Sequence, residues 1–389
     1  MLDATDLLAE MVAIPSVNPL LPGALPGDDE QNVAAFIAGH LRSGGAEVEL
    51  QEVKDGRCNV IAHAPRSGDA DDAVILMTGH MDTYPAGGPR SGYELVREDA
   101  ALYGRGSADA KGPLAAMVTA FLLAARSPSR REAYVVATVD EECLLMGARQ
   151  LVSHHMRPTL AITGEPTSLV PVTSQKGIIR GSLKVRGAAG HAAYPKGDTA
   201  IDAVARLVDA VHRLNQEYAN GPAHPVLGVP TMTVTKIQSG GGMNLVAEEV
   251  TVWFDARFLP GTSGERFARE VETALRAQLP GQDLVMDALN FISPANACVV
   301  DNPVVSEFFA QVEAVTGACE PEGFAYGSEA GVLAEICDSS LVFGPGDARY
   351  SHGQVEMIDA GELDAATEIF RRLLVPTSDR GTRHAGNPS

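Results

Sequence analysis

The apolar residues in the first half of the chain follow two alternating patterns. Residues 32–43 repeat large apolar side chains every three or four positions, which predicts an amphipathic helix, and similar patterns predict helices at 111–125 and 303–316. Four short, almost entirely apolar runs accompany these helices. The runs are Ala73–Thr78, Ala133–Val139, Leu160–Thr163 and Ser340–Phe343. Such runs are typical of central strands in a mainly parallel sheet that helices cover on both faces.

The middle of the chain has a different order of elements. Its patterns predict strands at 177–187, 231–237, 249–258 and 283–289 and helices at 199–214 and 264–279. This β-α-β-β-α-β order is that of a ferredoxin-like α+β domain. Within 249–258 apolar residues alternate with polar ones, so we expect one face of this sheet to be buried and the other exposed.

These patterns predict an α/β protein in which one domain is inserted into another. We expect a domain with a mainly parallel sheet, built from residues 1–174 and 290–375, and an inserted α+β domain of residues 175–289. Residues 376–389 are expected to form a flexible tail. A length of 389 residues fits two domains, each of which can bury a core.

Charge and composition exclude several classes of function. The chain has 50 Asp and Glu against 30 Lys and Arg, a formal net charge of −20, so nucleic acids and anionic membranes would repel it. We expect no signal peptide at the acidic N-terminal segment and no membrane span, because no apolar run is long enough. Five scattered cysteines without a CxxC pair favour a reduced, cytoplasmic protein.

Polar side chains with metal-binding chemistry follow each of the four apolar runs. These residues are His80, Asp82, Glu141, Glu142, Glu165 and His352. A further carboxylate, Asp109, lies just before the predicted helix 111–125, where a helix N-terminus favours negative charge. Because the carboxyl ends of parallel strands meet at one edge of a sheet, we expect these side chains to lie close together there.

Histidine and carboxylate ligands without cysteine suit zinc, cobalt or manganese. Several carboxylates with only two histidines fit a site of two metal ions that share one carboxylate. Asp82 can accept the second ring N–H of His80, and the pair Glu141–Glu142 offers a general base beside a ligand. Each motif alone is also compatible with a solvated loop or turn, and only their convergence on one sheet edge favours a metal site.

The motifs also resemble those of a known family. In order and spacing they are similar to those of the co-catalytic metallohydrolases that include acetylornithine deacetylase, succinyl-diaminopimelate desuccinylase, aminoacylase and glutamate carboxypeptidase. The resemblance extends from about residue 3 to 375, and its motifs are TGHMDTYP, LYGRGSADAKG, VDEE, GEPT, RGAAGHAAYP, GGMN and FGPGDARYSHGQVEMI. It implies a catalytic α/β domain with an inserted lid that also serves in dimerisation.

The resemblance implies a role for each metal-binding side chain. His80 and Glu165 would hold one metal ion, and Glu142 and His352 would hold the second. Asp109 would bridge the two ions. The ions are expected to be zinc, with cobalt or manganese as alternatives.

The resemblance also implies the catalytic and substrate-binding residues. Glu141 would be the general base and Asp82 the partner of His80. His191 would reach the site of a second subunit and stabilise the oxyanion, which implies a homodimer. Asn244 and Arg257 would grip the substrate, with an ion pair inside the lid as the alternative for Arg257.

The metal ligand after the third strand bears on the substrate. In this family that ligand is a glutamate in deacylases and carboxypeptidases, so Glu165 resembles the ligand of these members. Residues 325–346 look closest to acetylornithine deacetylase. We therefore predict a metal-dependent amidohydrolase that removes an acyl group from a small N-acyl amino acid. The alternatives are a carboxypeptidase or dipeptidase with the same machinery and, more remotely, a non-catalytic binding relative.

Overall fold

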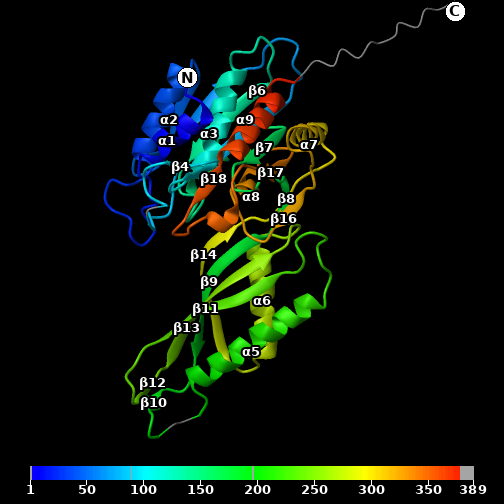
Figure 1. The fold of residues 1–389 in the computed structure, drawn as a ribbon. Helices are drawn as coiled ribbons and strands as arrows, with labels where there is room; N and C mark the ends of the chain where they lie inside the picture. The colour runs from blue at the N-terminus through cyan, green and yellow to red at the C-terminus, as the bar shows by residue number, and fades with distance from the viewer. Residues whose placement is uncertain (1, 89, 195–196, 377–389) are drawn as a thin grey trace, which may run out of the picture. The chain divides into compact units, whose positions relative to one another are not determined.

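A computed structural model describes residues 2–88, 90–194 and 197–376 of the chain. The chain divides into two compact units (Figure 1). The first unit consists of Met1–Pro171, Val299–Glu320 and Ile336–Ser389, and the second of Val172–Cys298 and Pro321–Glu335. The predicted flexible tail, residues 376–389, lies almost wholly outside the described residues.

The strands of the first unit form a mixed sheet with a parallel centre. They lie in the order β1 (Glu47–Lys54), β2 (Arg57–Ala64), β6 (Glu132–Thr138), β3 (Val74–His80), β7 (Leu160–Thr163) and β17 (Ser340–Val342). β3 runs parallel to β6 and β7, and β17 runs parallel to β7, whereas β1 and β2 are antiparallel. The mainly parallel sheet expected from the four apolar runs is confirmed, and their carboxyl ends share one edge.

The helices of the first unit pack around a nearly all-apolar helix, α3 (Lys111–Ala124). Thirteen of its residues are buried, because α1, α9 and the sheet surround it. The other long helices are α1 (Ala4–Val12), α2 (Gln31–Ser43), α7 (Pro303–Thr316) and α9 (Ala360–Leu374). α7 begins where Asn302 caps its first turn and ends at Gly317, which has a φ of 87°.

Small elements complete the first unit at the ends of the main strands. They are the helix α4 (Met146–Leu151), the 3₁₀ turn η1 (Ala348–Tyr350) and a three-stranded sheet of β4 (Val96–Glu98), β5 (Ala101–Tyr103) and β18 (Met357–Asp359). β5 pairs with both β4 and β18, so the segment after His352 is tied to the segment before Asp109.

The second unit contains a four-stranded antiparallel sheet covered by two helices. The sheet order is β11 (Thr231–Ser239), β13 (Glu249–Phe258), β9 (Gly177–Arg186) and β14 (Asp283–Ser293), and the helices are α5 (Ala200–Ala219) and α6 (Gly264–Gln278). Alternate side chains of β13 are buried, as the period of two predicts. Thr199 and Asp202 form a capping box at the start of α5. A two-stranded ribbon, β10 (Gly190–His191) and β12 (Leu245–Val246), extends this unit.

The bounds of the second unit differ from those of the predicted insertion. It also contains residues 321–335, which we expected in the first domain, with β16 (Glu322–Phe324) and α8 (Ala330–Leu333). The reason is pairing: β16 lies parallel to β8 (Val172–Gln175), and β15 (Asn296–Ala297) lies antiparallel to it. The Ser328 hydroxyl also donates to the Gln175 side chain at 2.8 Å. The β16 and Ser328 contacts join segments about 150 residues apart in sequence, which a local pattern does not reveal.

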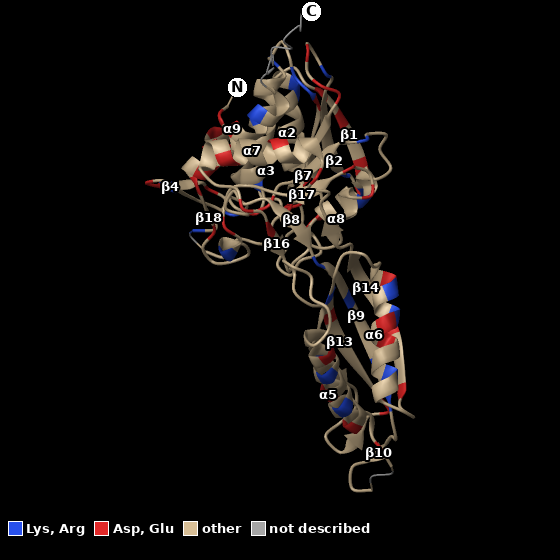
Figure 2. Cartoon of the chain, turned by 90° about the vertical axis from the view of Figure 1, so that its right-hand side faces the viewer, with Lys and Arg blue, Asp and Glu red and all other residues tan. Residues whose placement is uncertain are grey.

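The two helices of the second unit carry charged residues of both signs. Basic and acidic positions are interspersed along α5 and α6 (Figure 2). Among the described residues, no helix has the length and apolar character that a membrane span requires.

Candidate metal centre

The end of β3 positions the first predicted ligand. His80 is the last residue of the strand, pairs in register with Thr138 of β6 and is 1% exposed. Its Nδ1 lies 2.8 Å from the backbone oxygen of Asp82, so Nε2 faces the opposite way, toward Asp109 at 3.0 Å. The backbone carbonyl therefore fixes which nitrogen of His80 points into the site.

Asp109 lies between the two histidines. One carboxylate oxygen is 3.0 Å from Nε2 of His80, and the other is 3.2 Å from Nε2 of His352. The same nitrogen of His352 is 2.9 Å from Glu142, and Glu165 is buried at the end of β7. Each oxygen of Asp109 thus faces a different set of neighbours, which is the arrangement of a bridging carboxylate.

Two groups of side chains could each hold a cation. His80, Asp109 and Glu165 form the first group, and Asp109, Glu142 and His352 form the second. Within each group the candidate ligand atoms lie within 4.8 Å of one another. These are the two ligand sets that the family resemblance implies. Two imidazoles and three carboxylates without a thiolate form a donor set that suits zinc, cobalt or manganese.

Burial among like charges makes the two glutamates unfavourable as free anions. Burial and the charges of Glu141 and Asp109 raise the pKa of Glu165 well above its ordinary value. Burial and the charge of Asp109 raise the pKa of Glu142 to about 7. A bound divalent cation would offset this repulsion, so the electrostatics of the cluster fit a metal site.

The two histidines compensate part of the same charge. Burial acts to lower their pKa values, but hydrogen bonds with the carboxylates outweigh it. The pKa of His80 is therefore raised well above its ordinary value, and that of His352 rises to about 10. Burial acts to raise the pKa of Asp109, yet its hydrogen bonds to His352 and His80 lower it.

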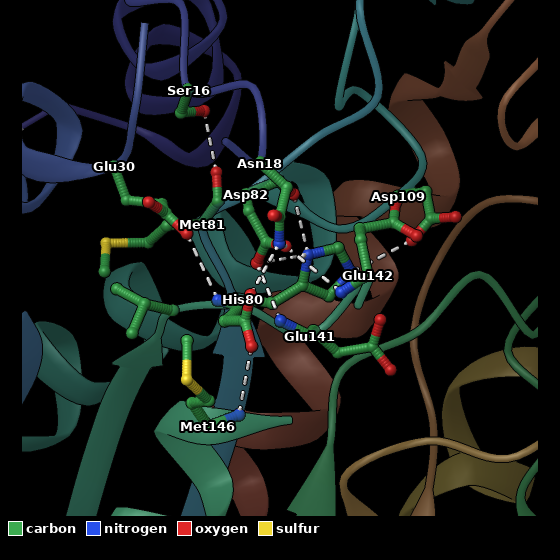
Figure 3. A network of polar contacts seen from close by, with 12 residues as sticks. Ser16, Asn18, Glu30, His80, Met81, Asp82, Asp109, Glu141, Glu142 and Met146 are labelled. Carbon is green, nitrogen blue, oxygen red and sulfur yellow. Dashed lines mark hydrogen bonds and ion pairs between the residues drawn. The ribbon is translucent and has the colours of Figure 1, made fainter. Parts of the chain in front are cut away.

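Asp82 contacts His80 differently from what we expected. The nearest carboxylate oxygen of Asp82 is 3.6 Å from Nδ1 of His80, and the short contact comes from the backbone oxygen instead. The carboxylate accepts the backbone N–H groups of Glu141 at 3.0 Å and Glu142 at 3.1 Å (Figure 3). The side chain of Asp82 therefore holds the turn that carries the predicted base and a predicted ligand, because it accepts the backbone N–H groups of both residues.

Sequence reasoning missed a buried ion pair that holds the other loops. Glu356 accepts the backbone N–H groups of Ala108 and Asp109, and it pairs with Arg105 at 2.6 Å. Arg105 also donates to the carbonyl of Gly353 at 2.9 Å. The pair therefore ties the Asp109 loop to the segment that follows His352. The available signal was a charged residue inside each of two motifs, LYGRGSADAKG and FGPGDARYSHGQVEMI.

A second missed residue is aromatic. The ring of Tyr84 stacks on the imidazole of His352, with centroids 3.9 Å apart and planes inclined by 23°. Tyr84 follows the β3 segment closely, so one stretch of chain supplies a predicted ligand and supports another. An aromatic residue directly after the TGHMDT segment was the signal for this contact.

The three predicted lid residues belong to the second unit. His191 is exposed on β10, where its Nδ1 accepts the N–H of Ala193 at 3.1 Å. The backbone oxygen of Asn244 accepts the N–H of Ala192 at 2.9 Å. Arg257 makes a two-pronged ion pair with Asp255, at 2.6 and 3.1 Å, which is the alternative we considered for it.

Comparisons with known proteins identify the family of the chain. Residues 76–375 match the family described as Peptidase family M20/M25/M40. An acetylornithine deacetylase of Vibrio campbellii is 30% identical over 90% of this chain and 93% of its own length. A second, from Photorhabdus laumondii, is 29% identical over 95% of this chain and 96% of its own length.

Solved structures share the fold. The aminopeptidase PepT of Bacillus cereus superimposes with a TM-score of 0.75 at 19% sequence identity, over 95% of this chain and 97% of that one. Its likeness concerns the architecture alone. Together with the match over residues 76–375, these findings establish that the chain belongs to peptidase family M20/M25/M40 and is a metal-dependent hydrolase acting on amides.

Proposed function

We propose that the protein removes the acyl group from an N-acyl amino acid, as an acetylornithine deacetylase does. One observation carries the proposal: two ligand groups share Asp109, and the turn that supplies Glu142 also supplies Glu141. The names of the relatives, which match over nearly the whole of both chains at about 30% identity, favour the deacetylase over other amide hydrolases.

The ligand roles in this proposal follow the two groups. His80 and Glu165 would hold one ion, Glu142 and His352 would hold the other, and Asp109 would be shared by both groups. Zinc is the proposed ion, with cobalt and manganese as alternatives. When bound, two such ions polarise the amide carbonyl and make water more acidic.

Glu141 acts as the general base in this proposal. Its backbone is held by the Asp82 carboxylate, so its side chain starts from a fixed point beside the ligand Glu142. The carboxylate of Glu141 takes a proton from the attacking water and returns it to the nitrogen of the leaving amine. A separate base is needed because all the other carboxylates of the cluster have ligand or positioning roles.

The second unit supplies the remaining groups. His191 of a second copy of the chain donates a hydrogen bond to the oxyanion, which requires a homodimer. Its exposed position on β10 makes the ring accessible for this role. Arg257 exchanges Asp255 for the substrate carboxylate, a swap between two bidentate partners, and Asn244 contacts the substrate. We further propose a cytoplasmic enzyme, since five scattered cysteines suit a reducing compartment.

A substrate panel tests the proposal. The zinc-loaded protein should hydrolyse N-acetyl amino acids, including Nα-acetylornithine, at least about tenfold faster in kcat/KM than dipeptides, a difference of about 1.4 kcal/mol. A preference for dipeptides would instead favour the carboxypeptidase or dipeptidase. No hydrolysis of any amide by protein that binds two ions would favour the non-catalytic relative.

Metal analysis tests the ligand roles separately. Chelation should abolish hydrolysis, and added Zn²⁺ or Co²⁺ should restore it. His352→Ala should leave at most one tightly bound ion per chain and little activity. Two bound ions and full activity in this variant would show that the ligand assignment is wrong.

A further inference from the structure

A buried layer of charged and polar side chains lies behind the turn that carries Glu141 and Glu142. Its members are Asn18, Glu30, Arg57 and Asp140 (Figure 3 shows Asn18 and Glu30). Arg57 is 6% exposed, and the other three are 0% exposed. None of the four is among the proposed ligands or catalytic groups, so the reaction does not explain why they are buried.

Arg57 holds the first residue of the turn in two ways. Its guanidinium forms a two-pronged ion pair with Glu30, with Nε at 2.7 Å, and it also reaches the Asp140 carboxylate at 3.4 Å. Glu30 in turn accepts the backbone N–H of Asp140 at 3.1 Å. Asp140 has a φ of 65°, a conformation that is uncommon for a residue with a side chain and that needs support from its surroundings.

Asn18 extends this support to the rest of the turn. Its amide nitrogen donates to Asp140 at 3.0 Å and to Asp82 at 2.8 Å. The Asp82 carboxylate then receives the N–H groups of Glu141 and Glu142. A continuous set of hydrogen bonds therefore leads from Arg57 to the backbone of both functional glutamates.

General stability does not account for this layer. Three carboxylates, on Glu30, Asp82 and Asp140, are buried, and Arg57 forms ion pairs with two of them. Replacing buried ion pairs with apolar side chains of similar size is often neutral or stabilising, so a charged layer is a poor device for stability alone. Its bonds converge instead on one turn, whose two glutamates must be placed to within a fraction of an ångström for catalysis.

We propose that Arg57 is a positioning residue that acts through Glu30 and Asp140 to set the turn carrying Glu141 and Glu142. The inference rests on the proposed function of those two glutamates. Arg57 contacts Glu30 and Asp140, neither of which is a proposed ligand, so its loss should reduce kcat while two metal ions still bind.

The test compares two buried arginines of the same unit. Arg57→Lys keeps the charge but loses the fork that grips Glu30. Arg131→Lys is the matched control: Arg131 is 2% exposed and grips Asp71 and Glu307, but it precedes β6, at the end of the strand opposite the turn. With zinc-loaded protein and an N-acetyl amino acid, we expect Arg57→Lys to lower kcat about 10- to 100-fold with KM within about twofold. Arg131→Lys should lower the melting temperature and leave kcat unchanged.

The cobalt-substituted protein gives a readout that does not depend on turnover. Its visible absorption reports the geometry of the ligands, so Arg57→Lys should change the spectrum and Arg131→Lys should not. If the wild-type protein hydrolyses no amide, the proposed function fails, yet the spectra still decide the role of Arg57. An unchanged spectrum with kcat within twofold of wild type, or an equal loss of kcat in both variants, would overturn the inference.

A second variant covers the case in which Arg57→Lys does not fold. Asn18→Ser retains one hydroxyl donor in place of the two bonds of the amide. It should lower kcat about tenfold and leave two ions bound. Wild-type kcat together with a wild-type cobalt spectrum in Asn18→Ser would then contradict the proposed positioning role of this layer.

Discussion

The two units differ in whether they bury charged side chains. In the second unit ion pairs such as Arg186–Glu249 and Arg266–Glu270 lie on the surface, over a core of apolar side chains between the sheet and its two helices. In the first unit Glu30, Asp82 and Glu165 are buried, at 0%, 0% and 7% exposure. The contrast is one of placement, because both units carry acidic and basic residues.

This difference separates the side chains that stabilise the protein from those that serve its reaction. An exposed ion pair contributes about 0–1 kcal/mol, so the second unit depends on its apolar core. Buried carboxylates close to one another destabilise a fold unless a cation or a hydrogen-bond donor faces each of them. The first unit contains such a cluster where four strands end, and we infer that the cluster is there because the reaction requires it.

The largest expected effect comes from changing one charge beside the cluster. Glu141→Gln should lower kcat by about 10²- to 10⁴-fold, because the proton acceptor is lost while the shape of the side chain is kept. Stability and metal content should stay as in the wild type, since Glu141 is proposed to hold no ion. Steady-state kinetics, metal analysis and thermal melting measure the three quantities. Loss of a bound ion in Glu141→Gln would show that Glu141 is a ligand, and the proposed division between base and ligand would be wrong.

The next largest effect is expected in the core of the second unit. Phe258 is fully buried and its ring lies 5.6 Å from that of Phe267, so Phe258→Ala should destabilise this unit by about 3–5 kcal/mol. The single tryptophan, Trp253 on the same strand, reports unfolding of this unit by fluorescence in a denaturant titration. Phe258→Leu is the control, with an expected loss of about 1 kcal/mol. A loss below about 1 kcal/mol for Phe258→Ala would mean that the apolar core does not dominate.

A buried arginine away from the cluster tests the first unit's stability. Arg131 donates to Asp71, to Glu307 and to the backbone oxygen of Leu373. Arg131→Met should cost about 2 kcal/mol, less than for a fully buried pair, because Asp71 and Glu307 remain partly in solvent.

The same pair predicts a pH dependence. The hydrogen bond from Arg131 lowers the pKa of Asp71, so the stabilisation is present above the ordinary pKa near 4 and disappears as the pH falls through the lower folded value. The difference in stability between wild type and Arg131→Met, measured in metal-free protein, should therefore shrink in acid. A difference that stays constant down to pH 2 would contradict the pairing.

The smallest effect is expected on the surface of the second unit. Arg266 and Glu270 lie one helical turn apart on α6, with a 2.9 Å contact and side chains 68% and 52% exposed. Arg266→Ala should change stability by no more than about 0.5 kcal/mol, and added salt should reduce the change. The tryptophan titration used for Phe258→Ala measures it. A change above about 1 kcal/mol would show that surface ion pairs contribute substantially to the stability of this unit, in addition to its apolar core.

The sequence by itself determined the central strands, several of the helices and the residue types of the site. Short apolar runs predict the parallel strands, and the alternation in 249–258 predicts a strand with one buried face. The reason is that successive side chains of a strand point to opposite faces, so the spacing of apolar residues shows which face is buried. His80, Glu142, Glu165 and His352 could be grouped in advance since parallel strands end at a common edge, and the family resemblance implies that Asp109 joins them.

Only the tertiary structure decided how these side chains are held. The carboxylate of Asp82 turns to the backbone of residues 141 and 142, and its supporting layer joins Asn18, Glu30 and Arg57, which come from three separate segments. Residues 321–335 likewise join the second unit through pairing with β8. Local patterns report whether a side chain is buried, but its partner across 60 to 120 residues is selected by packing of the whole chain, where each buried polar group must find a hydrogen bond.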